Sequence, residues 1–206
     1  MKLYYAPGAC SLASHIVARE AGIEIALEKV DTRTKRTEAD RDFLAINPKG
    51  YVPALELVDG EVLTEGAAIL QYLADSKPDA GLAPAHGTLA RSRLHEALSY
   101  VSSELHKSYT PLFNPATSEE VREERKAYLV KRYSLLDQVL ADQPFLLGED
   151  FSVADAYLFT VTQWAGYVSL DLSDFQALDA FQARVRSRPA VQAALQAEGL
   201  VPAKAA

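Results

Sequence analysis

The chain has 206 residues, of which 49% are hydrophobic and 24% charged, enough for a buried core in one or two domains. The formal net charge of -7 argues against nucleic acid as a partner, because binding to phosphates depends on lysine and arginine. One cysteine excludes an internal disulfide and fits a reducing cytoplasm, and no segment approaches the roughly 20 apolar residues that cross a bilayer. We therefore expect a cytoplasmic protein that binds small molecules or proteins, with no membrane association.

The first 76 residues alternate between strand and helix patterns. Short apolar or alternating segments predict strands at 2–6 and 24–31, and two further strands form a hairpin around Asp59-Gly60. Apolar residues at helical spacing predict helices at 11–22, 38–47 and 66–75. The order βαβαββα defines a predicted α/β domain at 1–76. The Pro- and Gly-rich segment 77–87 is predicted to be a linker.

Almost all of the remaining chain, 88–206, is predicted to form an all-helical domain. Long helices are expected at 89–109 and 119–142. The segment 151–168 is apolar nearly all round, which indicates a buried central helix, and Ser152 and Asp155 at its start match a capping box. A final helix at 175–196 is expected to be kinked or divided at Pro189.

Cys10 lies between the Pro7-Gly8 turn and the first predicted helix. Free backbone amides and the helix dipole favour negative charge there, so the sequence predicts a lowered pKa and a thiolate. The alternative is that Cys10 only fills buried space, as free cysteines often do. No second cysteine exists for a dithiol cycle, but a mixed disulfide with an external thiol remains open.

Polar side chains on the first long predicted helix form a second candidate group. Ser99, Ser103, His106 and Lys107 follow at i, i+4, i+7 and i+8, so an α-helix places them on one face beside an apolar stripe. Such a face can line a seam between two domains, where ligand clefts tend to form. The alternative is an ordinary solvated helix face.

A third group surrounds the predicted hairpin. Glu65 could hold an ammonium, and the bare amides at the helix start that follows it could hold a carboxylate. A cis bond between Val52 and Pro53 would expose the backbone of Val52 to an extended, peptide-like ligand. Together with Cys10, these groups describe a site for a small peptide that carries its own thiol. No metal site is predicted; His15 and His95 are expected to be structural or solvated, and His86 belongs to the predicted linker.

Blocks along essentially the whole chain resemble the glutathione transferases, most closely the bacterial beta class. "YAPGACSL" and "SSELHK" together are specific to that class, whereas "VPAL" and the capping box in "FSVADAYLF" are shared more widely. The resemblance implies a thioredoxin-like N-terminal domain joined to an all-helical C-terminal domain, the GST fold. It also implies a homodimer that uses glutathione as co-substrate in detoxification, without a metal.

The resemblance also implies site residues. Cys10 would meet the sulfur of glutathione through a hydrogen bond or a mixed disulfide, with His106 as a second catalytic group. The implied glutathione-binding residues are Tyr5, Lys35, Val52, Pro53, Glu65, Gly66, Ser99, Ser103 and Lys107. Tyr109, Leu112 and Trp164 are candidates for the hydrophobic substrate wall, although core packing is the simpler expectation for Trp164. Gly66 and Ser99 depart from the serine and asparagine that are common at these positions in the family.

Three functions follow from these observations. The main hypothesis is a glutathione transferase that stabilises the thiolate of glutathione and adds it to a hydrophobic electrophile. The second is a glutathione-dependent thiol-disulfide transferase that acts through Cys10. The third is a non-enzymatic module that binds hydrophobic ligands or proteins through the same fold.

Overall fold

The computed structural model describes residues 1–201, which form two compact units. Unit 1 contains residues 1–82 together with the segment from Ser187 onward, and unit 2 contains residues 83–186. The expected division placed all of 88–206 in one helical domain. The structure instead groups the last segment with unit 1, because α10 (Pro189–Ala197) packs against α1 (Ser11–Glu20). The final predicted positions, 202–206, lie outside the described residues.

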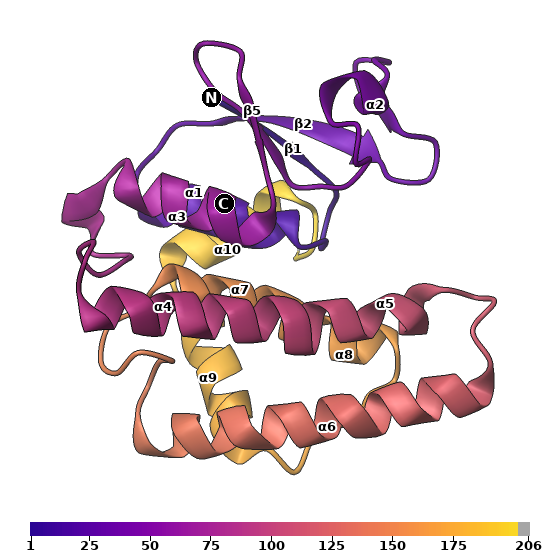
Figure 1. Ribbon diagram of the computed structural model, residues 1–206, viewed down its shortest axis with the longest axis vertical. Coiled ribbons are helices and arrows are strands. Elements are labelled where there is room, and N and C mark those ends of the chain that lie inside the picture. The colour runs from indigo at the N-terminus through magenta and orange to yellow at the C-terminus, as the bar shows by residue number, and fades with distance from the viewer. Residues whose placement is uncertain (202–206) are drawn as a thin grey trace. The chain divides into compact units, whose positions relative to one another are not determined.

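Unit 1 is built on a mixed sheet with strand order β3-β2-β1-β4-β5. Its strands are β1 (Lys2–Tyr5), β2 (Ala26–Asp31), β3 (Arg36–Thr37), β4 (Ala54–Glu56) and β5 (Val62–Thr64). β1 pairs in parallel with β2 and antiparallel with β4, so Leu3 lies between Leu27 and Leu55. The helices α1, α3 (Gly66–Asp75) and α10 lie together on one side of the sheet, and the short α2 (Phe43–Ile46) lies on the other (Figure 1).

The helix predicted at 38–47 is much shorter in the structure. Thr37 pairs with Val30 in the antiparallel β2–β3 ladder, and Asp40 takes a positive φ of 58° that an α-helix cannot continue through. The carboxylate of Asp42 then accepts a hydrogen bond from the amide of Leu44, so α2 begins only at Phe43. The Phe43 ring packs into a core with Tyr4, Val30, Val52 and Ala54 on that side of the sheet.

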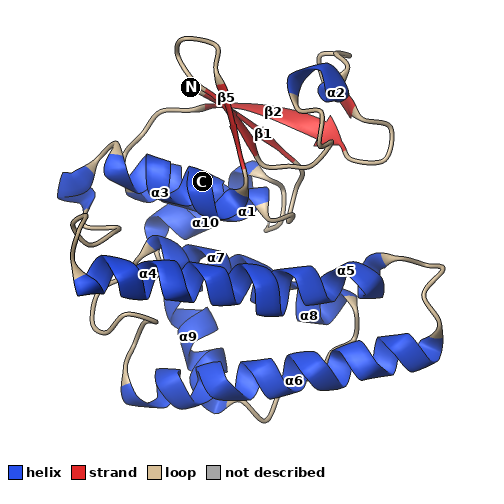
Figure 2. Cartoon of the chain, in the orientation of Figure 1, coloured by secondary structure: helices blue, strands red, loops and turns tan. Residues whose placement is uncertain are grey.

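Unit 2 is helical, as Figure 2 shows. α4 (Leu89–Tyr100) continues through a π-helical stretch, Val101–His106, into α5 (Lys107–Phe113), and we call this stretch the π turn. The other helices are α6 (Glu119–Asp142), α7 (Val153–Thr162), α8 (Trp164–Tyr167) and α9 (Gln176–Arg186). The expected break at Pro189 is present, because α9 ends at Arg186 and Pro189 is the first residue of α10 in unit 1.

The apolar segment 151–168 predicts one buried central helix; α7 confirms it from Val153 to Thr162, where every residue is buried, but the structure then starts the separate α8, whose last two residues are exposed. The predicted capping box of α7 is also present. The carboxylate of Asp155 accepts hydrogen bonds from the Ser152 amide at 2.8 Å and from the Leu146 amide at 2.8 Å. Within residues 1–201, none of the helices combines the length and the apolar character that a membrane span requires.

Candidate functional site

The turn between β1 and α1 brings Cys10 to the backbone of Val52. The turn closes through an Ala9 N–H to Ala6 C=O hydrogen bond of 3.0 Å, and the Ser11 hydroxyl bonds to the backbone of Ala6 at 3.2 Å. Cys10 then takes the N-cap position of α1 and is partly exposed. Its Sγ donates a hydrogen bond to the Val52 carbonyl oxygen at 3.1 Å. Two candidate residues that lie 42 positions apart in sequence are therefore in contact.

The predicted lowering of the Cys10 pKa is wrong, because the structure shows a raised one. Loss of solvation raises the pKa of the thiol to about 12, and the backbone amides of Cys10 and Ser11, which lower it, do not compensate. Glu65 raises it slightly further. The hydrogen bond to the Val52 carbonyl also requires the proton to be on sulfur. In this state Cys10 is a neutral hydrogen-bond donor.

We predict that alkylation of Cys10 by iodoacetamide in the ligand-free protein is slow and continues to accelerate with pH up to at least pH 10. A raised pKa leaves only a small thiolate fraction below pH 12, and this fraction grows about tenfold per pH unit. The measurement is the rate of mass increase between pH 6 and pH 10, with free cysteine as control. A rate that levels off below pH 8 would contradict the prediction.

The segment before β4 surrounds the Cys10 contact with further candidate residues. The Val52–Pro53 peptide bond is cis, as the sequence analysis considered. The Lys35 ammonium donates to the Gly50 carbonyl at 2.9 Å, and the side-chain amide of Asn47 donates to the Tyr51 carbonyl at 2.7 Å. Lys35 and Cys10 thus both donate hydrogen bonds to the short backbone segment 50–52, which contains Val52.

Glu65 occupies the N-cap position of α3 with a φ of 72°, and its side chain makes no capping hydrogen bond. Its carboxylate instead lies 2.6 Å from the Lys49 ammonium, which also donates to the Thr64 hydroxyl at 3.0 Å. Glu65 is therefore placed to accept an ammonium group. At Gly66, a Cβ would meet only Pro53 Cγ, at 4.0 Å, so a serine side chain would fit at this position.

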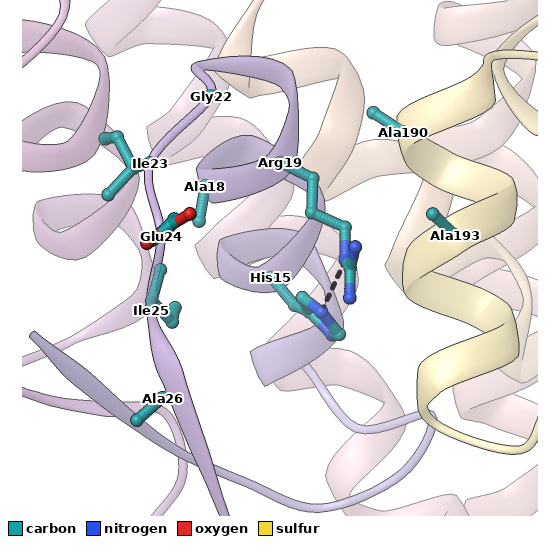
Figure 3. A pocket seen from close by; sticks show the side chains of 10 residues that line it. All are labelled: His15, Ala18, Arg19, Gly22, Ile23, Glu24, Ile25, Ala26, Ala190 and Ala193. Atoms are coloured by element: carbon teal, nitrogen blue, oxygen red, sulfur yellow. Dashed lines mark hydrogen bonds between the residues drawn. The ribbon is translucent and has the colours of Figure 1, made fainter.

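A chain of polar side chains, of which His15 and Glu198 are buried, supports the same turn. The carboxylate of Glu198 accepts hydrogen bonds from the Gly8 amide at 3.0 Å and from His15 Nδ1 at 2.9 Å. Arg19 Nε donates to His15 Nε2 at 2.8 Å, and this pair lines a cavity of about 920 Å³ between α1, β2 and α10 (Figure 3). Tyr5, at the start of the turn, has its ring centroid 6.5 Å from that of His15, and burial raises the pKa of the Tyr5 hydroxyl. His15 thus has the structural role expected for it.

In unit 2 the π turn divides the predicted polar face. Ser99, Ser103 and Lys107 are exposed, whereas His106 is half-buried. His106 Nδ1 lies 2.6 Å from the Tyr157 hydroxyl, and its ring lies edge-on to Trp164 with centroids 4.8 Å apart. The prediction of one face assumed α-helical spacing throughout, but a π turn contains an additional residue, equivalent to roughly 100° of helix rotation.

The three residues predicted to form a hydrophobic substrate wall are almost entirely buried. Tyr109, Leu112 and Trp164 are 0%, 4% and 6% exposed, and the Tyr109 hydroxyl bonds to that of Tyr133 at 3.0 Å. The exposed aromatic residue beside them is Phe113, at 49%, which stacks on Tyr109 at 6.3 Å and meets Trp164 edge-on at 5.8 Å. Phe113 is not among the predicted site residues, although its i+4 spacing from Tyr109 indicates this contact.

Comparisons with known proteins agree with the resemblance stated above. The family model described as glutathione S-transferase, N-terminal domain, matches residues 8–76, and the corresponding C-terminal domain model matches residues 100–189. Glutathione S-transferase GstA of Escherichia coli O157:H7 is 50% identical over 97% of this chain and 100% of its own.

Solved structures agree as well. A sphingomonad glutathione S-transferase complexed with glutathione superimposes with a TM-score of 0.94 and 49% identity, over 98% of this chain and 100% of that one. A beta-class enzyme of Sphingomonas chungbukensis gives a TM-score of 0.95, 49% identity and the same coverage.

Within residues 1–201, no group of three or more histidine, cysteine or acidic side chains is arranged to hold a metal ion.

Proposed function

This chain belongs to the glutathione S-transferase family, and we propose that it binds glutathione, stabilises its thiolate and transfers it to hydrophobic electrophiles. The observation that carries the proposal is the contact between Cys10 Sγ and the Val52 carbonyl, because it brings a thiol donor next to the backbone to which we assign the tripeptide. The sphingomonad relative of this chain was solved with glutathione bound.

In the proposed complex, unit 1 binds the tripeptide along its length. Val52 pairs through its backbone with the cysteinyl residue, next to Pro53. Glu65 binds the γ-glutamyl ammonium, and the amide of Gly66 at the start of α3 binds the adjacent carboxylate. Lys35 binds the glycyl carboxylate. The existing Lys49–Glu65 contact of 2.6 Å supports the assignment of Glu65, since an ammonium already occupies that carboxylate.

Cys10 acts in this proposal as a donor and not as a nucleophile. The thiol of glutathione has an ordinary pKa of about 8.5, so little of it is ionised at neutral pH. A protonated Cys10 can turn from the Val52 carbonyl to the glutathione sulfur and donate a hydrogen bond to the thiolate, which lowers the pKa of glutathione. Tyr5 supports the Cys10 turn, and Ser99, Ser103, His106 and Lys107 contribute further polar and cationic groups.

The electrophile requires an apolar surface. We assign this surface to Phe113, with the buried rings of Tyr109 and Trp164 and the side chain of Leu112 packed beneath and beside it. The thiolate attacks the electrophilic carbon, a carbon–sulfur bond forms, and the leaving group departs with the bonding electron pair. In this assignment Tyr109, Leu112 and Trp164 pack against Phe113 and hold it in place, and Phe113 contacts the substrate.

We also propose a cytoplasmic homodimer, as is typical of the family. A groove of about 550 Å³ runs between α4 and α6, and the partly exposed side chains of Leu135 and Val139 line it together with Tyr100. Exposed apolar surface of this kind often marks a site of contact with another protein, and we assign it to the second subunit.

The test is a panel of aryl halides, epoxides and mixed disulfides assayed with glutathione, comparing the wild type with Cys10→Ala. We expect conjugation of at least one electrophile, reduced by about tenfold in the variant by loss of one hydrogen-bond donor, while disulfide reduction is weak in the wild type. Strong disulfide reduction that disappears in Cys10→Ala would instead support the thiol-disulfide transferase. A protein without activity that also fails to bind immobilised glutathione would support a non-enzymatic module.

A further inference from the structure

The π turn in unit 2 is fixed from α6 at three points. Before the turn, the Tyr100 hydroxyl donates to the Arg132 carbonyl at 3.0 Å. After it, the hydroxyls of Tyr109 and Tyr133 are hydrogen-bonded at 3.0 Å. These two contacts hold the flanking helices α4 and α5 against α6 on either side of the additional residue.

The third contact comes from inside the turn and is made by Glu104. Its carboxylate accepts a hydrogen bond from the Tyr128 hydroxyl and lies 3.0 Å from Arg132 Nε. The Arg132 guanidinium in turn lies over the Tyr128 ring, 4.5 Å from its centroid. Glu104 also accepts from the Ser103 hydroxyl at 3.3 Å. The hydrogen bond from Tyr128 and the charge of Arg132 hold the pKa of Glu104 below its usual range, so the carboxylate is charged at neutral pH.

The residues that follow this contact lie in two different environments. Two residues after Glu104, His106 lies against Tyr157 and Trp164, and Lys107 is exposed. If the turn reverted to α-helical spacing, the segment after it would rotate by roughly 100° relative to the segment before it. His106 would then point where Lys107 points now, and Lys107 would turn by the same angle away from that direction.

We propose that Glu104 is a positioning residue: its contacts with Tyr128 and Arg132 hold the π turn and thereby set the placement of His106 and Lys107. This inference rests on the proposed function only where it assigns these two residues to glutathione. The placement itself can be measured without any ligand, because Trp164 is the one tryptophan of the chain and lies against His106.

The experiment measures Trp164 fluorescence against pH in the ligand-free protein. A protonated imidazole quenches an adjacent indole more than a neutral one, so the fluorescence midpoint reports on His106. We expect Glu104→Ala and Tyr128→Phe both to shift this midpoint, because both release the π turn. Glu96→Gln is the matched control, since Glu96 also forms an ion pair on this helix, with Arg93 at 2.7 Å, but lies before the π turn.

Tyr128→Phe is the decisive variant, because it preserves the ring and the charge of Glu104 and removes only the hydroxyl, which contacts both Glu104 and Arg132. Midpoints equal to the wild type in both variants would overturn the positioning role. A shift in Glu104→Ala without one in Tyr128→Phe would also overturn it, since loss of charge alone would explain the result. Failure of Glu104→Ala to fold leaves the decision to Tyr128→Phe.

The KM for glutathione is measured separately on the same variants. We expect an increase of about tenfold in Glu104→Ala with a smaller change in kcat, as for loss of one charge-assisted contact. A shifted fluorescence midpoint with an unchanged KM would support the positioning role of Glu104. It would contradict the assignment of His106 and Lys107 to glutathione, and so the two proposals can fail independently.

Discussion

Replacing Glu65 by glutamine is expected to raise the KM for glutathione by about 10- to 100-fold, the range for loss of one charge-assisted hydrogen bond to an ammonium. Glutamine preserves the length of the side chain and tolerates the same backbone, so the positive φ of 72° at this N-cap position is not a new source of strain. The measurement is steady-state kinetics with varied glutathione, together with calorimetric titration of glutathione into the protein.

Lys49→Ala provides the control for this prediction. It removes the ammonium that occupies Glu65 at 2.6 Å in the ligand-free protein and leaves the carboxylate in place. Both side chains are at least half exposed, so their ion pair contributes only about 0–1 kcal/mol, and its loss should leave KM unchanged or lower it by up to about fivefold. A KM for Glu65→Gln within twofold of the wild type would show that Glu65 does not bind the γ-glutamyl ammonium.

Local patterns predicted most elements of the fold. The helix at 66–75 has the bounds that its apolar spacing indicates, and the capping box at Ser152 and the break at Pro189 are where the sequence placed them. The helix predicted at 38–47 is too long because Asp42 forms a bridge with Arg36 and Asp40 has a positive φ, and no local pattern reports such a pairing. The segment 187–201 belongs to unit 1 because α10 packs against α1, and no local pattern reports this tertiary contact either.

The candidate site depended more on tertiary structure. The position of Cys10 at a helix N-terminus could be predicted, but the sign of its pKa shift could not, since desolvation depends on distant neighbours such as the Val52 segment. The π turn could not be predicted from local sequence either, because the contacts that hold it come from Tyr128 and Arg132 on another helix. Helical spacing identified Tyr109 and Trp164 as apolar, but only packing shows that Phe113 is the exposed member of their cluster.

The largest effect on stability is expected from Asp155→Ala, which should lower the free energy of unfolding by roughly 3–6 kcal/mol. The carboxylate is fully buried and accepts the amides of Leu146 and Ser152 and the hydroxyl of Ser152, at 2.7 to 2.8 Å. Its removal leaves two backbone donors buried without an acceptor, at about 1–3 kcal/mol each, and also deletes the capping box of the central helix. Equilibrium unfolding in urea measures the loss.

Asp150→Ala is the matched control, because Asp150 is an exposed carboxylate two residues before the cap. Its effect should stay within about 0.5 kcal/mol, as for an ordinary surface substitution.

Burial raises the pKa of Asp155 to about 6, so the folded protein binds this proton more tightly than the unfolded chain. The stability that Asp155 contributes, taken as the wild type minus Asp155→Asn, should therefore decrease as pH rises from 4 to 6. A difference that instead increased over this range would show that the buried carboxylate is stabilised by its three donors more than it is destabilised by desolvation.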